Sequence, residues 1–369
     1  MKRNLRIALL LQIIVSGVPL MADLFIPEFA VKLGASKFQI GIMGTAFALS
    51  MFLSSGFFGR LSDIIGRKKI LLAGFLFTGI FYAGASFAKM FSGLFLVRVL
   101  QGIAIGIYPG ALAAYVHENS GTMDEYAMWG ALGIASFFIF SGIIAGAKNI
   151  RWIFVFVGVF YLVSLIFALK LKAEFGPRKE LPLFPLSVVS RNLHVYIAIF
   201  LTYTGIGVTW TFWVLYLENL KISPYLIGVV TAVNPLFEFI TLRFVARKIR
   251  FGTIAFGILI LSATYPLFAF AKTVPQVLIL QAVSGFGWAF MFAGGLNEVI
   301  NNGSEKGTAT GLFQSSVSLG NIVGPLVAGI ISVFFKNINA IFIFAGIIIF
   351  LGFVEISVYN RILKKSVLR

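Results

Sequence analysis

The chain contains no cysteine and little charge. With no cysteine it forms no disulfide, no thiolate metal site and no cysteine nucleophile. Charged residues make up 12% of its 369 residues, whereas soluble proteins carry about 25%. The two histidines, His117 and His194, fall at expected helix ends, where an interfacial position is favoured over catalysis. These absences argue against a soluble enzyme and leave a membrane protein as the class to test.

Long apolar stretches fill the chain in place of charge. Hydrophobic residues make up 59% of the sequence and aromatic residues 15%, and the mean hydropathy is +0.97. A helix needs about 20 mostly apolar residues to cross a bilayer. The sequence therefore predicts an all-α polytopic membrane protein with twelve transmembrane helices, near residues 7–30, 38–59, 69–88, 92–116, 127–147, 152–171, 193–217, 225–245, 252–271, 275–300, 308–335 and 339–360.

One connection is much longer than the others. Residues 172–192 contain three prolines and charges of both signs, a composition that opposes helix and is typical of a linker. We therefore expect an N-terminal six-helix bundle over 1–172, a cytoplasmic linker over 173–192 and a C-terminal six-helix bundle over 193–369. Two pseudosymmetric bundles of this kind pack around a site near the bilayer midplane and rock against each other.

The positive charge is distributed unevenly. The formal net charge is +17, and most of the 30 Lys and Arg residues fall on one side of the expected topology. This bias is the positive-inside pattern, so we expect a multi-pass protein of the cell membrane with both termini in the cytoplasm. The basic residues then serve topology and contact with the lipid bilayer, and no nucleic-acid partner is expected. The segment 1–22 is interpreted as a retained first helix and not as a cleaved signal peptide, because no clear cleavage site follows it.

The most specific motif is a charged loop between the second and third spans. It reads GRLSDIIGRK over residues 59–68. This pattern resembles the signature loop of the major facilitator superfamily, written G-x-L-x-D-x-x-G-R-K. The resemblance implies an alternating-access transporter in which the acid, Asp63, forms a cytoplasmic latch with a neighbouring base or with the start of the eleventh span near 306–308. An ordinary positive-inside loop is the alternative. The gate residues are expected to be Gly59, Asp63, Gly66, Arg67 and Lys68.

The fourth span carries the only basic residue expected inside a membrane helix, Arg98. The run from Arg98 through Gln101 to Gly102 resembles the R-x-x-Q-G motif of drug/proton antiporters in the same superfamily. A buried charge at this position needs a partner at similar depth, and Asp23 of the first span lies at that depth. We expect Asp23 to be the protonatable group and Arg98 to tune it. A static ion pair that sets helix packing remains the alternative.

A second intramembrane acid lies in the eighth span. Glu238 follows Asn234 and Pro235 by about one helical turn, and it is a second candidate for proton or cation recognition. Snorkelling toward Arg243 or Arg247 is the alternative. Glu298 and Glu355, closer to the inner interface, are expected to be structural. Polar and aromatic side chains near the midplane are candidates for the substrate cavity, namely Gln101, Tyr108, Tyr203, Trp210, Asn234 and Trp288. For Trp210, a position in the aromatic belt at the membrane interface is the alternative.

Two departures from the antiporter pattern keep the function open. The fifth span lacks the proline of the usual G-x-x-x-G-P pattern, which occurs instead at residues 320–325 in the eleventh span, and Val15 replaces a second acid in the first. The favoured function is proton-coupled export of hydrophobic small molecules or drugs by a secondary active transporter. Proton-coupled uptake of a sugar or organic acid is the alternative, with a membrane-embedded enzyme or a channel more remote. The expected partners are a small-molecule substrate and protons, with no cofactor, no metal and a monomeric chain.

Overall fold

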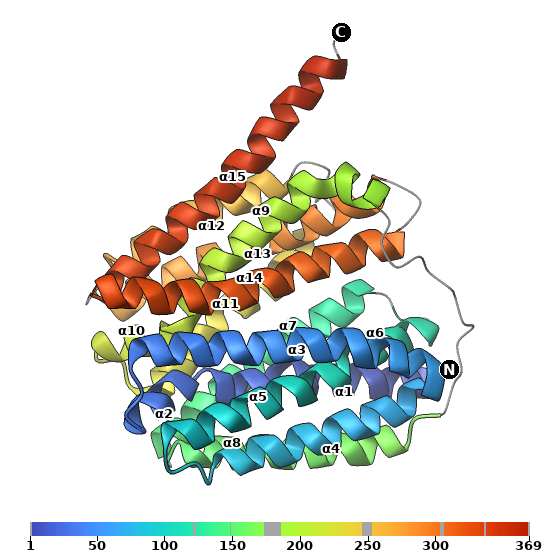
Figure 1. Ribbon diagram of the computed structural model, residues 1–369, viewed down its shortest axis with the longest axis vertical. Coiled ribbons are helices and arrows are strands. Elements are labelled where there is room, and N and C mark those ends of the chain that lie inside the picture. The colour runs from blue at the N-terminus through green and yellow to red at the C-terminus, as the bar shows by residue number, and fades with distance from the viewer. Residues whose placement is uncertain are drawn as a thin grey trace. The chain divides into compact units, whose positions relative to one another are not determined.

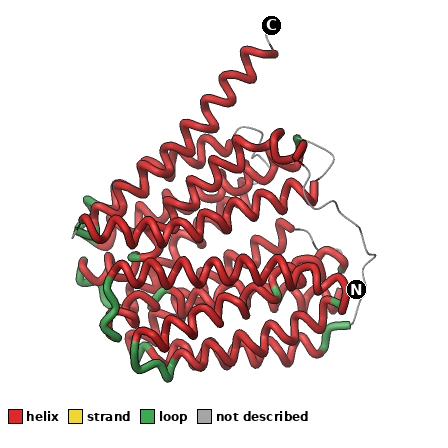
Figure 2. Tube along the Cα trace, viewed as in Figure 1, coloured by secondary structure: helices red, strands yellow, loops and turns green. Residues whose placement is uncertain are grey.

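The computed structural model describes most of the chain as helix. The described residues are 2–119, 121, 123–147, 149–172, 186–245, 253–302, 306–335 and 337–367. Within them the secondary structure consists of fifteen α-helices joined by loops, without a β-strand (Figure 2). The all-α prediction is therefore confirmed.

The first of two compact units contains residues 1–180 and 217–236. Within it, α1 packs against α7 and α8, α3 packs against α5, and α4 lies beside α5 and α8 (Figure 1). The apolar faces of these helices form the core of the unit. Its helices are α1 (Lys2–Asp23), α2 (Ile26–Lys32), α3 (Lys37–Ile65), α4 (Arg67–Ala85), α5 (Phe91–Ile107), α6 (Pro109–Glu118), α7 (Met123–Ala147) and α8 (Arg151–Leu169).

The second unit contains residues 181–216 and 237–369. Within it, α9 packs against α14 and α15, and α12 packs against α13 and α15. Its helices are α9 (Leu186–Thr211), α12 (Thr253–Phe268), α13 (Val274–Asn301), α14 (Lys306–Phe334) and α15 (Asn339–Val367). Two further helices, α10 (Trp213–Asn219) and α11 (Pro224–Val245), contribute residues to both units. Residues 173–185 of the expected linker lie outside the described residues, and the division at 172 and 193 stays a prediction.

The lengths of the helices agree with twelve membrane spans. Eleven described helical segments are long and apolar enough to cross a bilayer, and α12 is a shorter apolar helix of 16 residues. Two of the eleven are interrupted spans, since residues 3–32 include α1 and α2, and residues 91–118 include α5 and α6. The predicted polytopic architecture is confirmed, with interruptions that hydropathy alone did not reveal.

Three interruptions divide helices close to the groups of interest. α1 ends at Asp23 and α2 begins at Ile26, so the first span is broken immediately after its acid. α5 gives way to α6 at Tyr108, where Pro109 occupies the first helical position, because proline lacks the N–H that would continue the preceding helix. α9 similarly ends at Thr211, and α10 begins at Trp213 after one intervening residue.

Close helix packing depends on glycine at the crossing points. A Cβ on Gly133 of α7 would lie 2.1 Å from the carbonyl oxygen of Ile13 on α1. A Cβ on Gly102 of α5 would lie 2.4 Å from the carbonyl oxygen of Phe47 on α3. Any larger residue at these positions forces the backbones apart, so glycine sets the distance between the helices of the unit.

Candidate functional site

An ion pair joins α1 to α5 inside the first unit. A guanidinium nitrogen of Arg98, NH1, lies 2.7 Å from Oδ1 of Asp23, and the two side chains are 6% and 10% exposed. Asp23 is the last residue of α1, whereas Arg98 lies in the middle of α5. The structure therefore brings together the two charged residues that the sequence placed at similar depth in separate spans.

The guanidinium of Arg98 is held from several sides. NH1 also donates to Oε1 of Gln101 at 2.9 Å, one turn further along α5. The ring of Phe47 on α3 lies 3.8 Å from the guanidinium carbon, in cation–π geometry. Gln101 in turn donates from Nε2 to the carbonyl of Phe81 on α4 at 3.2 Å. Three helices thus fix the position of one cation, which is a more rigid arrangement than a pair between two mobile side chains.

Tyr82 of α4 is a further member of this site, and the sequence analysis missed it. Its hydroxyl donates to Oδ1 of Asp23 at 3.1 Å, and the residue is fully buried. No sequence pattern predicts that a single tyrosine in an apolar span contacts an acid 59 residues away. Next to it, the ring of Tyr161 on α8 stacks at 6.5 Å, and the hydroxyls of Tyr161 and Tyr108 are 2.6 Å apart. Tyr161 and Tyr108 thus form a hydrogen-bonded pair that is in ring contact with Tyr82.

The contacts of Asp23 suit an ionised carboxylate. In that form it has two donors and an opposite charge, and the pair with Arg98 has no net charge. A neutral Asp23 leaves the positive charge of Arg98 unbalanced within the apolar interior.

Two of the predicted cavity residues, Gln101 and Tyr108, lie in the same network. Gln101 is fully buried and Tyr108 is 2% exposed, and each is engaged by the neighbours described above. Tyr108 also packs edge-on against Phe75 of α4, with ring centroids 5.1 Å apart. The structure therefore places both side chains in the polar and aromatic interior of the first unit.

The second unit contains an aromatic cluster. The rings of Tyr203 on α9 and Trp288 on α13 meet edge to face at 5.8 Å, and Trp288 stacks on Phe292 at 5.2 Å. Glu238 lies on the part of α11 that belongs to the same unit. The structure thus brings Tyr203 and Trp288 together. Of the other predicted cavity residues, Trp210 is partly buried near the end of α9, and Asn234 is partly buried on α11.

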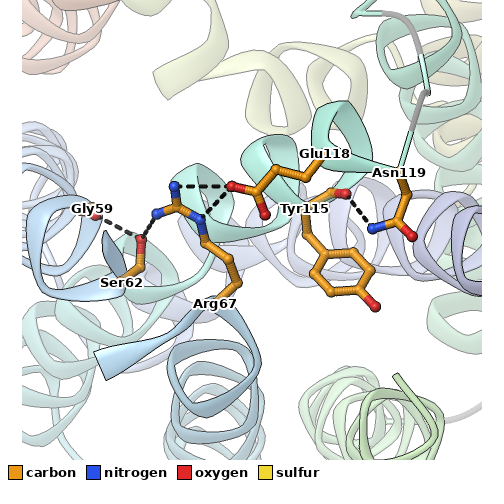
Figure 3. Close-up of polar contacts among 6 residues, drawn as sticks. All are labelled: Gly59, Ser62, Arg67, Tyr115, Glu118 and Asn119. Carbon is orange, nitrogen blue, oxygen red and sulfur yellow. Dashed lines mark hydrogen bonds and ion pairs between the residues drawn. The ribbon is translucent and has the colours of Figure 1, made fainter. Parts of the chain in front are cut away.

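The charged segment 59–68, expected from the sequence to be a loop, lies instead at the end of α3 and the start of α4 with only Gly66 between the helices. It forms a polar cluster with the end of α6 (Figure 3). Nε and NH2 of Arg67 each lie 3.3 Å from Oε1 of Glu118, and NH1 donates to the hydroxyl of Ser62 at 2.6 Å. Gly66, with φ of 98°, provides the turn that ends α3 and starts α4. Glu118 is a partner that the sequence did not identify, because it lies 51 residues from Arg67 and outside the motif.

The remaining gate residues are only partly accounted for by the structure. Lys68 donates from Nζ to the carbonyl of Leu169 at the end of α8, at 2.7 Å. Gly59 accepts a hydrogen bond from the Ser62 hydroxyl at 2.7 Å through its carbonyl. The side chains of Asp63 and of residues 306–308, which form the expected latch, lie outside the described residues.

The architecture is that of a polytopic helical membrane protein. A family model of the Major Facilitator Superfamily matches residues 8–192 and 195–365. The chain belongs to that superfamily and is a transporter, not an enzyme.

Two curated relatives are drug-resistance proteins. The chain is 25% identical over 359 residues to Multidrug resistance protein 2 of Bacillus subtilis, covering 88% of this chain and 87% of the relative. It is also 25% identical over 326 residues to the quinolone resistance protein NorA of Staphylococcus aureus, covering 82% and 83%. These likenesses extend over most of both chains.

Solved structures share the fold at lower identity. The nucleoside transporter NupG superposes with a TM-score of 0.77 at 16% identity, covering 97% of this chain and 98% of the other. The human organic anion transporter MFSD10 superposes with a TM-score of 0.67 at 17% identity, covering 96% and 99%. At these identities the likeness concerns the fold alone.

Proposed function

We propose that this transporter exports hydrophobic small molecules in exchange for protons, with Asp23 as the proton-binding group. The observation that carries the proposal is the buried contact of Asp23 with Arg98 and Tyr82. An intramembrane acid with a dedicated cation and a hydroxyl donor is typical of a proton-coupling site. In this mechanism protonation of Asp23 releases Arg98 from its partner, and the helices respond by changing the side from which the site is accessible.

The proposed substrate class is lipophilic and in part cationic. Support comes from the aromatic cluster of Tyr203, Trp288 and Phe292 and from Glu238 in the same unit, since aromatic faces and a carboxylate attract an apolar cation. The 25% identity to two drug-resistance proteins supports the same class. Gln101, Tyr108, Trp210 and Asn234 remain proposed contributors to the cavity.

The proposed cycle is alternating access between two six-helix bundles, residues 1–172 and 193–369, joined by a linker at 173–192. The segment 59–68, where α3 ends and α4 begins, acts as a gate on the cytoplasmic side. We place the protein in the cell membrane with both termini in the cytoplasm, and it works as a monomer. The charge distribution of the sequence supports this orientation.

Transport in proteoliposomes with an imposed pH gradient tests the proposal. A lipophilic cation is compared with a sugar, an organic acid and a nucleoside, the last because a fold neighbour is a nucleoside transporter. We expect the gradient to drive the lipophilic cation in wild type. In the Asp23→Asn variant, exchange of substrate across the membrane persists while the response to the gradient is lost.

A matched control is Glu28→Gln, which removes a carboxylate of α2 that pairs with the exposed Lys32. This variant is expected to keep the gradient response. A full response in Asp23→Asn rules out the proton role of Asp23. Gradient-driven movement of the sugar or organic acid, without movement of the lipophilic cation, favours metabolite uptake instead.

A further inference from the structure

A second buried pair of ionisable residues lies in the second unit, outside the groups used above. Nε2 of His194 on α9 is 3.2 Å from Oε1 of Glu298 on α13. The side chains are 4% and 1% exposed. The sequence analysis expected an interfacial position at a helix end for His194 and a structural role closer to the inner interface for Glu298. Their nearly complete burial changes that interpretation, because ionisable groups removed from water need a specific compensation.

The packing of neighbouring helices explains why this pair is sealed. A Cβ on Gly294 of α13 would lie 2.6 Å from the backbone nitrogen of Ile254 on α12. A Cβ on Gly295 would lie 2.8 Å from the ring of Phe313 on α14. These two glycines precede Glu298 by about one helical turn and allow both neighbouring helices to close over α13.

Polar groups next to the pair connect the same two helices. Nδ2 of Asn302 on α13 donates to Oδ1 of Asn192 on α9 at 3.0 Å. NH1 of Arg191 donates to the backbone carbonyl of Asn302 at 2.9 Å. The amides and the arginine thus hold α9 to α13, so the helices remain joined near the pair by bonds that do not depend on its protonation.

Two other titratable residues lie on helices that pack together in this unit. The hydroxyl of Tyr196 on α9 donates to the carbonyl of Ala309 on α14 at 3.2 Å. Glu355 of α15 is partly exposed and lies one turn beyond Gly352, where a Cβ would be 2.9 Å from the carbonyl oxygen of Ala198 on α9. Tyr196, Glu355 and Arg191 are thus charged or titratable groups on α9 and on a helix packed against it.

Oε2 of Glu298 is buried and has no hydrogen-bond partner. An ionised carboxylate with one bare oxygen is strongly disfavoured in an apolar interior, and a pair that keeps one proton is electrically neutral. We propose that His194 and Glu298 form a proton-binding site that holds one proton between Nε2 and Oε1. The proton lies either on the ring of an imidazolium facing a carboxylate or on the carboxyl group facing a neutral ring. Its loss leaves one net negative charge on the pair.

This site is independent of Asp23, since it lies in the other unit and its proton is exchanged without Arg98. The proposal therefore does not depend on the substrate or on the coupling role of Asp23.

Titration of the purified full-length protein in lipid nanodiscs tests the site directly. The chain has two histidines, so His117→Gln leaves His194 as the only histidine signal in an NMR titration of histidine-labelled protein. We expect Glu298→Gln in that background to shift the titration midpoint of His194 by about one pH unit or more, a tenfold change in proton affinity. Asn302→Ala is the matched control, because it removes the neighbouring bond between α9 and α13 without removing a titratable group, and its midpoint should stay at the wild-type pH.

An infrared measurement follows the other member of the pair, the carboxyl group of Glu298. His194→Gln should change the pH at which the carboxyl band of Glu298 appears, and that band is identified by its absence in Glu298→Gln. A His194 midpoint that is the same with and without Glu298 overturns the proposal, as does a carboxyl band that does not respond to His194→Gln. Neither measurement uses substrate or a gradient, so its result is separate from that of the transport experiment.

Discussion

The hydroxyl of Tyr82 donates a hydrogen bond to Oδ1 of Asp23 at 3.1 Å, the same oxygen that receives the guanidinium of Arg98. One carboxylate oxygen thus has two donors from two different helices, α4 and α5. A change of charge on Asp23 therefore alters a hydrogen bond to each of the two helices.

Replacement of Tyr82 by Phe removes this hydroxyl with almost no change in volume. A hydrogen bond to a charged group contributes about 1.5–3 kcal/mol, so we expect a measurable loss of thermal stability. The pH profile of transport should move toward higher pH, because the ionised carboxylate has lost a donor. Transport rates measured across pH in proteoliposomes check this, with Tyr225→Phe, an exposed tyrosine, as the control. An unchanged profile in Tyr82→Phe contradicts the role of the hydroxyl.

The pair of Asp23 and Arg98 should show strong coupling in a double-mutant cycle. Breaking a buried ion pair from one side costs about 3–5 kcal/mol, because the remaining charge is left without its partner. Arg98→Gln and Asp23→Asn are each expected to lower the melting temperature of the purified protein. The double variant should be more stable than the sum of the two losses implies. Additive losses indicate that the charges do not depend on each other.

The ion pair of Arg67 and Glu118 should contribute less to stability than the buried pair of Asp23 and Arg98. The side chains of Arg67 and Glu118 are 14% and 22% exposed, so part of their attraction is screened by solvent. We expect a coupling energy of about 1 kcal/mol between Arg67→Gln and Glu118→Gln. Thermal unfolding of the two single variants and the double variant measures it. A coupling close to that of Asp23 and Arg98 contradicts this ranking.

Glycine at the crossing of α1 and α7 is expected to be essential for packing. Gly133→Val places a side chain where even a Cβ would be 2.1 Å from backbone of α1, and forced overpacking costs typically about 1–3 kcal/mol or more. Gly84→Val is the matched control, since a Cβ there meets no described atom within 4 Å. Size-exclusion profiles and melting temperatures should separate the two variants. Equal stability of both contradicts the packing argument.

A carboxyl group outside the spans provides a pH prediction. Burial, together with the nearby Glu28, raises the pKa of Glu218 from its ordinary value of 4.5 to about 7. The folded protein therefore binds this proton more tightly than the unfolded chain. The stabilisation is complete below pH 4.5 and is lost as pH rises toward 7. Glu218→Gln should flatten the fall in melting temperature over this interval, whereas Glu355→Gln serves as a control that leaves it in place.

The sequence predicted the class of fold because apolar length and charge bias act locally. It also placed Asp23 and Arg98 at equal depth, since helical rise converts residue number into depth. Tyr82, Glu118 and the sealed pair of His194 and Glu298 could not be found in this way, because their partners come from other helices. Hydropathy also misses the break after Asp23, because an interrupted span is as apolar as a continuous one.

The electrical neutrality of the ionised pair of Asp23 and Arg98 has a consequence for energetics in a living membrane. A neutral pair moves through the bilayer without doing work against the membrane voltage. Once Asp23 accepts a proton, Arg98 leaves one positive charge on the moving helices. A full crossing of that charge changes the energy by about 2.3 kcal/mol per 100 mV. The membrane voltage therefore exerts a force on this site when Asp23 is protonated and none when the pair with Arg98 is ionised.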